Sequence, residues 1–500
     1  MQFTDTLREN HAQAREEIAD RHFGAVIDGE TRSAASGETF EPVDPAVNEP
    51  ITTVASCGEA DVNAAVEAAD GAATDWGDMD ATDRGDLLRE WVAAMRDHLD
   101  EFALLGALEV GKPLEFARAD VENGLDFFEY YASVAVAETG EHVPTGDDSH
   151  AYVRHEPYGV TGQILPWNYP ILLMGWKVGA ALAAGNTAVV KPPSPAPLSV
   201  ILAGQLAAET LPDGVVNVVP GSGSAVGDPL IDHRRVGKIS FTGSVPVGQE
   251  IMRTAADTVT PVTLELGGKN PFIVFPDADV EEAAATVATG GMYNAGQSCD
   301  SATRILVHED VEEEFREAYL DELDGWEPGD PLAEGTTMGP LAYAGHAESV
   351  DDYVDLGREE GATLLRGGPL EDGEYADGAY YRPTVFDDVD PQMRIAREEV
   401  FGPVQFLFTF SEYEEAIEIA NDVDYGLTAG VATGNPSVAH RAAADVEAGS
   451  VWVNRYFGTV PGTPFGGFKQ SGFGRECAQQ AIEEHRRTKA VNMAVDDPPY

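Results

Sequence analysis

The sequence predicts an α/β fold in which βαβ units form parallel sheets. Segments whose apolar residues recur at helical spacing alternate with short β-branched runs along the 500 residues. A hydrophobic content of 43% supplies material for large cores. A chain of this length usually forms about two to four domains. Since no internal repeat or long linker divides it, we expect the domains to be interleaved or closely packed.

The expected elements alternate from position 61 onward. Val62, Ala65 and Val66 fall on one helical face and Asp61 precedes them as the expected N-cap, which predicts a helix over 61–76. Further helices are expected at about 83–104, 197–211, 279–290 and 311–323. Strands are expected at 160–165, 187–190, 215–219, 238–242, 270–275 and 303–307.

The net charge is strongly negative, since 87 acidic residues against 31 basic ones give -56 at pH 7. Nucleic acids and anionic membranes are therefore not expected as partners, because too few Lys and Arg are present to neutralise phosphate. The acids recur along the chain, for example at 312–314, and we interpret them as solvated faces of folded elements. Because dissolved salt screens such self-repulsion, the composition predicts a halophilic source.

The cysteines and the apolar segments bear on the compartment. Cys57, Cys299 and Cys477 form neither a zinc motif nor a disulfide framework, so no metal site and a reducing compartment are expected. The first residues lack the basic start and apolar run of a signal peptide. The most apolar stretch, 171–190, is interrupted by Lys177 and several glycines. We therefore expect a cytoplasmic protein without a membrane span.

Cys299 stands in the setting with the most chemical promise. It follows Gly296-Gln297-Ser298 on a loop between an expected helix and an expected strand, where a thiol can be exposed enough to attack a substrate. A buried, inert thiol is the alternative for a lone cysteine. Position alone does not decide between the two.

Two polar side chains could serve such a thiol. Glu265 lies in an apolar run between Leu264 and Leu266, where burial would raise the pKa of its carboxyl towards that of a general base. An edge strand that turns Glu265 to solvent is the alternative, and a nucleophilic cysteine favours the base. Asn168 follows a strand end in a Pro-bounded turn, where its amide could donate to an oxyanion or bond its own backbone.

Two glycine-containing loops, 221–227 and 241–248, follow expected strands. Both place backbone N–H groups at a strand-to-helix turn, where a pyrophosphate could bind. Neither has the usual G-x-G-x-x-G spacing, so each is a weak signal by itself.

Together these segments resemble the aldehyde dehydrogenase superfamily of NAD(P)-dependent enzymes, from position 61 to Glu476. The resemblance rests on seven motifs in family order: Pro166-Trp167-Asn168, Lys191-Pro192, Phe241-Thr242-Gly243-Ser244, Glu265-Leu266-Gly267-Gly268-Lys269, Gly296-Gln297-Ser298-Cys299, Glu398-Glu399-Val400-Phe401-Gly402-Pro403 and Pro464-Phe465-Gly466-Gly467-Phe468-Lys469.

The resemblance implies three structural parts and a homodimer or homotetramer. A Rossmann-like cofactor-binding domain is expected at 1–136 and 157–262, an α/β catalytic domain at 263–460, extending to about 484, and small β oligomerisation segments at 137–156 and 485–500.

The resemblance also implies a hydrolytic, non-acylating mechanism. Cys299 would add to a small-molecule aldehyde, Asn168 and the Cys299 N–H would hold the oxyanion, and Glu265 would activate the water that hydrolyses the thioester. Lys177 and Glu476 match positions that relay the proton outward. The implied substrate tunnel consists of the aromatic residues Tyr169, Trp176, Tyr293 and Phe465.

The cofactor implied by the resemblance is NAD or NADP. Lys191 would bond the adenosine ribose and Glu399 the nicotinamide ribose. The implied cofactor-binding residues are Leu165, Pro166, Trp167, Lys191, Ser194, Gly227, Phe241, Thr242, Gly243, Ser244, Gly248, Leu266, Glu399 and Phe401.

Two departures from the family pattern carry expectations of their own. Many NAD-preferring relatives have Glu where this chain has Ser194, and the missing repulsion predicts that NADP is accepted. Asp300 follows the nucleophile directly. Its carboxylate would raise the pKa of the thiol if it pointed inward, whereas on an extended segment it would face away without effect, which is the expectation.

Several alternatives stay open. The tunnel is expected to be apolar, but its aromatic faces would also suit an ammonium, so a betaine-aldehyde or semialdehyde dehydrogenase is an alternative to a general one. Transfer of the thioester to coenzyme A is disfavoured by Glu265. A catalytically silent binding protein with this fold is disfavoured by the intact Cys299, Asn168 and Glu265.

Overall fold

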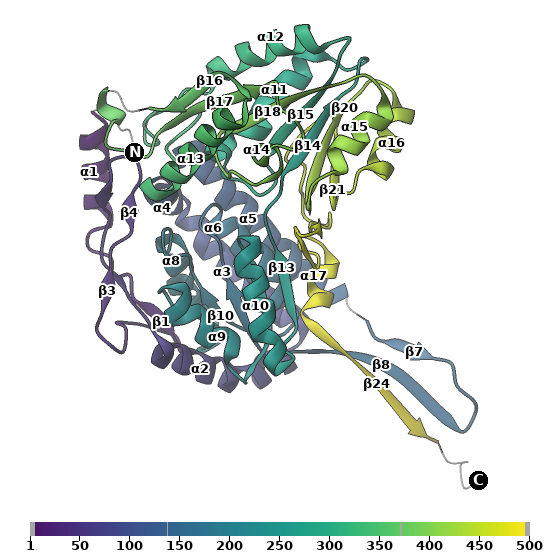
Figure 1. The fold of residues 1–500 in the computed structure, drawn as a ribbon. Coiled ribbons are helices and arrows are strands. Elements are labelled where there is room, and N and C mark those ends of the chain that lie inside the picture. Colours follow the sequence, from purple (N-terminus) through teal and green to yellow (C-terminus); the bar gives the residue numbers. More distant parts are fainter. Residues whose placement is uncertain (1–5, 138, 371–372, 496–500) are drawn as a thin grey trace.

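The computed structural model describes residues 6–137, 139–370 and 373–495. They form two large, mostly parallel sheets with helices around them and a small third sheet that projects from the body (Figure 1). In this view the eight-stranded sheet lies in the lower half and the seven-stranded sheet in the upper half. The α/β class with parallel sheets is confirmed.

The eight-stranded sheet has the order β2-β1-β11-β10-β9-β12-β13-β23. Its inner strands from β11 to β13 are parallel, and the outer strands are antiparallel to their neighbours. The strands are β1 (Ala25–Ile27), β2 (Glu30–Arg32), β9 (Val160–Ile164), β10 (Thr187–Lys191), β11 (Val216–Val218), β12 (Val236–Thr242), β13 (Val262–Glu265) and β23 (Gly472–Phe473).

The seven-stranded sheet has the order β16-β17-β18-β15-β14-β20-β21, in which only β16 is antiparallel to its neighbour. Its strands are β14 (Asn270–Val274), β15 (Ala302–His308), β16 (Thr363–Pro369), β17 (Tyr381–Asp387), β18 (Val404–Phe410), β20 (Thr428–Ala432) and β21 (Ser450–Val453). Short strand pairs complete the described chain: β3 (Thr39–Phe40) with β6 (Val54–Ala55), β4 (Val43–Asp44) with β5 (Glu49–Pro50), and β19 (Tyr425–Gly426) with β22 (Phe468–Lys469).

The helices expected at 61–76, 197–211, 279–290 and 311–323 are confirmed, each within two residues of the expected bounds. Further α-helices complete the set in the described part of the chain. The complete set is α1 (Leu7–Ile18), α2 (Glu59–Asp78), α3 (Ala81–Asp97), α4 (Leu99–Val110), α5 (Leu114–Val134), α6 (Pro170–Met174), α7 (Ala180–Ala183), α8 (Leu198–Thr210), α9 (Asp228–Asp232), α10 (Val245–Thr258), α11 (Val280–Met292), α12 (Glu312–Glu322), α13 (Ala344–Glu360), α14 (Arg394–Arg397), α15 (Tyr413–Asn421), α16 (Pro436–Asp445) and α17 (Gln479–Glu484). None of the helices in these parts of the chain is long and apolar enough to cross a bilayer.

Two details of the expected helices are wrong. The N-cap of α2 is Gly58, and Asp61 sits one turn further on, where its carboxylate accepts from the Gly58 N–H at 3.0 Å. Asp61 therefore caps the helix from its third position, in the manner of the second half of a capping box, and is not itself the N-cap. The helix expected at 83–104 is two helices, because His98 (φ -107°, ψ 17°) leaves the helical conformation and both ends α3 and begins α4.

The projecting sheet consists of β24 (Arg486–Ala494), β8 (Ser149–Pro157) and β7 (Glu141–Val143), all antiparallel. It lies within the segments expected to mediate oligomerisation, of which residues 138 and 496–500 are outside the described residues. The expected domain boundaries stay a prediction, and strand β13, at the expected boundary after 262, pairs within the eight-stranded sheet.

Candidate active site

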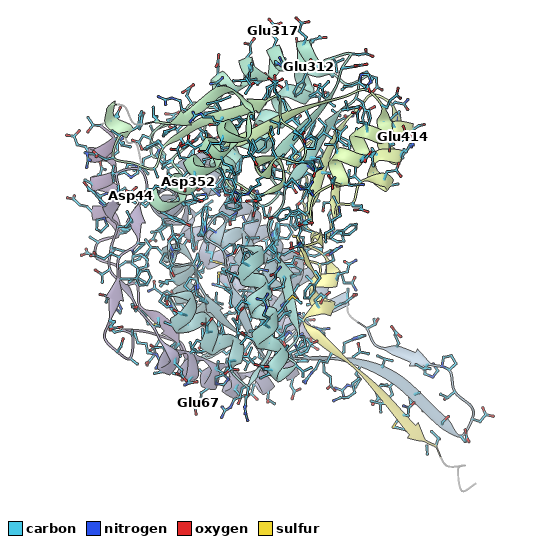
Figure 2. All side chains as sticks on the ribbon, viewed as in Figure 1. Asp44, Glu67, Glu312, Glu317, Asp352 and Glu414 are labelled. Carbon is cyan, nitrogen blue, oxygen red and sulfur yellow. The ribbon has the colours of Figure 1, made fainter. Side chains whose placement is uncertain are left out.

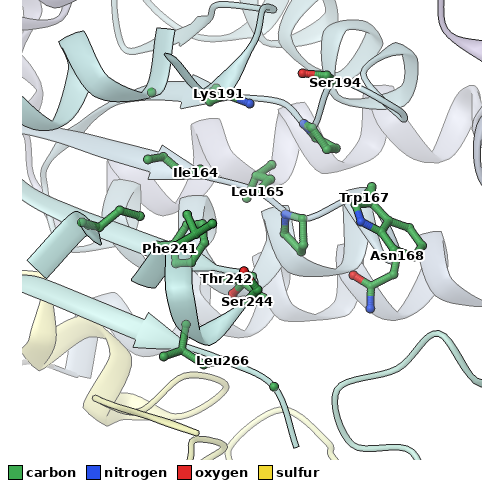
Figure 3. Close-up of a pocket in the computed structure, with 18 of the residues that line it drawn as sticks. Ile164, Leu165, Trp167, Asn168, Lys191, Ser194, Phe241, Thr242, Ser244 and Leu266 are labelled. Atoms are coloured by element: carbon green, nitrogen blue, oxygen red, sulfur yellow. The ribbon is translucent and has the colours of Figure 1, made fainter. Parts of the chain in front are cut away.

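A cavity of about 520 Å³ opens where the parallel strands of the eight-stranded sheet end (Figure 3). Ile164, Lys191 and Thr242 are the last residues of three neighbouring strands and all line it, as expected for a ligand site at the carboxyl edge of such a sheet. Every expected cofactor-binding residue except Gly248 lines this cavity, together with Asn168 and Cys299. Gly248 has a packing role, because a Cβ there would lie 2.7 Å from Leu266 Cδ2.

The start of α10 forms one wall of the cavity. Ser244 is its N-cap, and among the described residues no side-chain cap bonds the N–H groups of the first turn. These groups and the helix dipole favour an anion. Of the two glycine-containing loops, 241–248 therefore supplies a helix N-terminus, whereas 221–227 contributes Gly223 and Gly227 to the lining.

Polar side chains stand at both ends of the expected cofactor path. Burial lowers the pKa of Lys191 to about 8, and its Nζ donates to the Pro192 carbonyl at 3.0 Å. The Ser194 hydroxyl donates to the Gly221 carbonyl at 3.0 Å. Glu399 accepts from the Gly268 N–H at 3.0 Å, and burial raises its pKa to about 7.

The turn that carries Cys299 is shaped by three residues with positive φ. Asn294, Ala295 and Gly296 have φ between 54° and 69°, and a Cβ on Gly296 would lie 2.2 Å from the Gly402 carbonyl oxygen. Only glycine fits this close approach. The Asn168 amide reaches the same turn and donates from Nδ2 to the Gln297 carbonyl at 2.9 Å. One amide hydrogen is thereby fixed, and the second is free to meet a substrate oxygen.

Burial and nearby carboxylates keep the Cys299 thiol protonated at rest. Burial raises its pKa well above the usual value, and the charges of Asp300, Glu265 and Glu399 raise it further. The expectation that Asp300 has no effect is wrong. Residues 299 and 300 form a turn and do not extend, so the alternation of faces does not apply, and Asp300 accepts from the Ser298 hydroxyl at 2.6 Å.

Glu265 ends strand β13 and is buried, which excludes the solvent-facing alternative. Neither carboxylate oxygen has a hydrogen-bond partner among the described residues. Burial raises its pKa well above the usual value, the Glu476 charge adds to this, and Lys177 and Arg475 oppose it. Lys177 and Glu476 pair at 2.5 Å with both side chains buried. The structure thus brings the three expected proton-handling residues together.

The expected tunnel residues lie around the other side of the Cys299 turn. The rings of Trp176 and Phe465 are 5.0 Å apart, and the Ser298 hydroxyl donates to the Tyr169 hydroxyl at 3.1 Å. Tyr293 donates to Asp120 at 3.0 Å. The lining is therefore aromatic but not purely apolar.

Sequence reasoning missed four residues of this region. Lys112 forms a buried pair with Asp120 and donates to the Asn168 carbonyl at 3.1 Å. Tyr343 and His346 line the cofactor cavity, where the rings of His346 and Trp167 are 5.4 Å apart. The Gly111-Lys112-Pro113 turn was a readable signal, because Lys is rare in this chain. Within the described ranges, no group of three or more His, Cys, Asp or Glu side chains is placed to hold a metal ion.

Comparison with known proteins agrees with this geometry. The model of the aldehyde dehydrogenase family matches residues 32–491. A putative aldehyde dehydrogenase from Burkholderia cenocepacia is 39% identical, with 96% of this chain and 99% of that chain covered and a TM-score of 0.94. Betaine aldehyde dehydrogenase from Staphylococcus aureus, solved with NAD+, is 36% identical over 98% of both chains, with a TM-score of 0.95.

A third similar structure is indole-3-acetaldehyde dehydrogenase AldA from P. syringae, solved as a Cys-to-Ala variant with NAD+ and IAA. It is 37% identical over 98% of this chain and 100% of that chain, with a TM-score of 0.95. The family model and the neighbours agree in identity, coverage and fold. This chain is therefore an oxidoreductase that belongs to the aldehyde dehydrogenase family.

Proposed function

We propose that the chain catalyses the NAD(P)-dependent, hydrolytic oxidation of an aldehyde to its carboxylic acid. The observation that carries this proposal is the position of Cys299, which lines the large cavity together with Asn168 and lies near enough to Glu265 for that charge to raise the pKa of its thiol, while the Glu265 carboxyl has no hydrogen-bond partner among the described residues. A nucleophile, an oxyanion donor and a base are the groups that such a reaction requires.

The residues of the cavity fit a nicotinamide dinucleotide. The free N–H groups of α10 suit a pyrophosphate, Lys191 and Glu399 suit the two riboses, and Gly227 leaves room beside the Lys191 side chain. Two similar structures were solved with NAD+. When bound, the nicotinamide would accept the hydride that leaves the substrate carbon.

The chain's own groups would carry the other steps. The Cys299 thiol gives its proton to Glu265, which passes it to Lys177 and Glu476, and the sulfur bonds to the aldehyde carbon, while the free Asn168 amide hydrogen and the Cys299 N–H hold the oxygen of the thiohemiacetal. After the hydride has left, a thioester remains on Cys299. Glu265 then takes a proton from the attacking water, and Lys177 and Glu476 receive that proton from Glu265.

We propose that NADP is used at least as well as NAD. The Ser194 hydroxyl faces the Gly221 carbonyl, so no carboxylate at this position repels a 2′-phosphate. Asp228 and Glu250, which also line the cavity, would repel a 2′-phosphate. Direct comparison of the two cofactors decides between these opposing charges.

We propose a neutral or cationic aldehyde as the substrate. A semialdehyde would bring a carboxylate that needs a free cation, whereas Lys112 is already paired with Asp120. Asp300 adds a further carboxylate beside Cys299, which makes the surroundings of the thiol more negative. Aromatic rings and a surplus negative charge favour an ammonium by about 0.5–2 kcal/mol, which keeps a betaine-type aldehyde as the second candidate.

The proposal extends to a halophilic, cytoplasmic homodimer or homotetramer. Figure 2 shows acidic side chains such as Glu67, Glu317, Asp352 and Glu414 on the outside of widely separated parts of the molecule, and all four are exposed. The three-stranded sheet projects away from the body in Figure 1, where a second subunit could cover it. No nucleic acid or membrane partner is proposed.

The test is an aldehyde panel with NAD and with NADP, followed by the absorbance of the reduced cofactor. We expect Cys299→Ala to abolish oxidation while cofactor binding persists, and Cys57→Ala, which removes another buried thiol, to leave the rate unchanged. Turnover above a few per cent in Cys299→Ala would remove this thiol from the mechanism. A need for coenzyme A would indicate an acylating enzyme, and binding without turnover a silent one.

A further inference from the structure

One face of the eight-stranded sheet carries a row of buried polar side chains. Lys238 and Ser240 alternate with apolar residues on β12, and Ser240 is in register with Thr263 on β13 and Gln163 on β9. Alternation places these side chains on one face with Glu265, while Val160, Ile164, Ile239, Phe241 and Leu264 form an apolar cluster on the other. Central parallel strands are normally apolar on both faces, so the presence of these buried polar side chains calls for an explanation.

The row of polar side chains begins at Glu265, the proposed general base, and continues past the buried ion pair of Lys177 and Glu476. Lys177 Nζ donates to the Ser240 hydroxyl at 3.2 Å as well as to Glu476. Ser240 and Thr263 are register partners on strands about 4.8 Å apart, so their side chains stand beside each other on the same face, where one water between the two hydroxyls would continue the path. Thr263 in turn accepts from Lys238 Nζ at 2.5 Å.

The row ends at the surface. Lys238 Nζ lies 4.0 Å from Glu484 Oε2, and the Lys238 side chain is 2% exposed whereas that of Glu484 is 39% exposed. Glu484 is the last residue of α17. A buried amine therefore stands between the interior hydroxyls and a carboxylate in contact with solvent.

The charged groups around Lys238 leave its amine able to gain and lose a proton. Burial lowers the pKa of Lys238 to about 8, with Glu484 and Glu476 raising it and Lys177 lowering it. The other facing groups are the Tyr158 ring at 6.0 Å, which Arg487 also contacts, and His485. Burial and the two lysine charges lower the pKa of His485 to about 3, so the imidazole stays neutral.

We propose that Lys238 and Glu484 conduct to the surface the proton that Glu265 takes from water, through the Lys177–Glu476 pair and the hydroxyls of Ser240 and Thr263. This inference rests on the proposed hydrolytic function. In that step the water oxygen bonds to the acyl carbon, one water proton goes to Glu265, and the carbon–sulfur bond breaks with its electron pair going to Cys299. Glu265 must lose this proton before the next turnover, and its buried carboxyl needs an exit for it.

The experiment follows reduced cofactor and proton release together, by stopped flow in weakly buffered salt with a pH indicator. In Lys238→Arg the positive charge stays but the group cannot deprotonate, so we expect an unchanged burst of reduced cofactor, followed by a steady state in which reduced cofactor and protons both appear about 10-fold or more slowly than in the unaltered enzyme. Lys238→Met should behave alike. Glu484→Gln should delay release less, because water reaches this end of the row.

Glu483→Gln is the matched control, because it removes the same charge from the neighbouring exposed residue of α17. A steady state of Lys238→Arg as fast as that of the unaltered enzyme overturns the proposal, even if Lys238→Met fails to fold. Equal delays in Glu483→Gln and Glu484→Gln would reduce the role of Glu484 to general surface charge and overturn its part. Absence of any reduced cofactor from the unaltered enzyme with every aldehyde would instead refute the proposed function.

Discussion

Raising the pH from 6 to 10 should remove a large part of the stability that one buried histidine provides. His11 of α1 lies between two carboxylates, with Nδ1 2.6 Å from Asp44 and Nε2 3.1 Å from Asp330. Both ring nitrogens must donate to satisfy these contacts, so the imidazolium form is the one that fits. Burial lowers the pKa of His11, but the hydrogen bonds and charges of Asp330 and Asp44 outweigh it and raise the pKa to about 9.

The magnitude follows from linkage between protonation and folding. An unfolded histidine titrates near 6.5, so a native pKa of about 9 differs by about 2.5 units, or ~3 kcal/mol. Because the native pKa is raised, the contribution is complete below pH 6.5, declines between pH 6.5 and 9, and is absent above. Hydrogen bonds from His11 and Asn10 lower the pKa of Asp330 against the effect of burial. Protonation of Asp330 therefore changes the stability only at acid pH and does not affect the range from pH 6 to 10.

The assay is urea denaturation at fixed molar salt across pH 6 to 10, with His11→Gln and, as the control, the exposed His440→Gln. We expect the unaltered protein and His440→Gln to lose ~3 kcal/mol more than His11→Gln over this range. Parallel curves for all three proteins would show that the ring is neutral in the native state and would refute the reasoning.

The remaining predictions concern catalysis and assembly. Glu265→Gln should keep a burst of reduced cofactor but turn over very slowly, since the thioester forms before water is activated; a normal steady state would point to another base. Ser194→Glu should shift preference strongly to NAD, as the ratio of kcat/KM for the two cofactors will show. Light scattering in high salt should give a dimer or tetramer, whereas a 53.3 kDa particle would contradict the proposed assembly. Melting temperature should rise steeply with KCl and more than with an uncharged osmolyte, because the -56 charge is screened.

Sequence reasoning found the parts of the site whose chemistry is local. Glu265 ends an apolar run and is followed by two glycines, and Cys299 follows Gly296 on a tight turn, so their neighbours in the sequence are also their neighbours in space. The cofactor cavity was predictable for the same reason, since its walls are strand ends and the turns after them.

What the sequence could not show depends on contacts between distant segments. Lys112 supports the Asn168 carbonyl from 56 residues away, and His346 reaches the Phe401 carbonyl from 55 residues away. The effect of Asp300 was missed because it depends on whether its segment extends or turns. The break at His98 was missed because the apolar spacing continues through it, although the backbone does not.

The distribution of lysine connects the composition of the chain to its chemistry. The chain has seven lysines, and five of them are buried: Lys112, Lys177, Lys191, Lys238 and Lys269. Lysine is normally a surface residue, so this is a reversal of its usual place. Arginine supplies most of the exposed ion pairs, such as Arg8 with Glu49 and Arg441 with Glu414.

A selective pressure against surface lysine would leave it only where arginine cannot replace it. Arginine stays protonated at any physiological pH, whereas a buried lysine can release its proton and fits a narrower space. Burial lowers the pKa of both Lys191 and Lys238 to about 8, close to the range in which an amine both takes and gives a proton. We therefore expect the few buried lysines to mark the interior positions at which the amine itself is required.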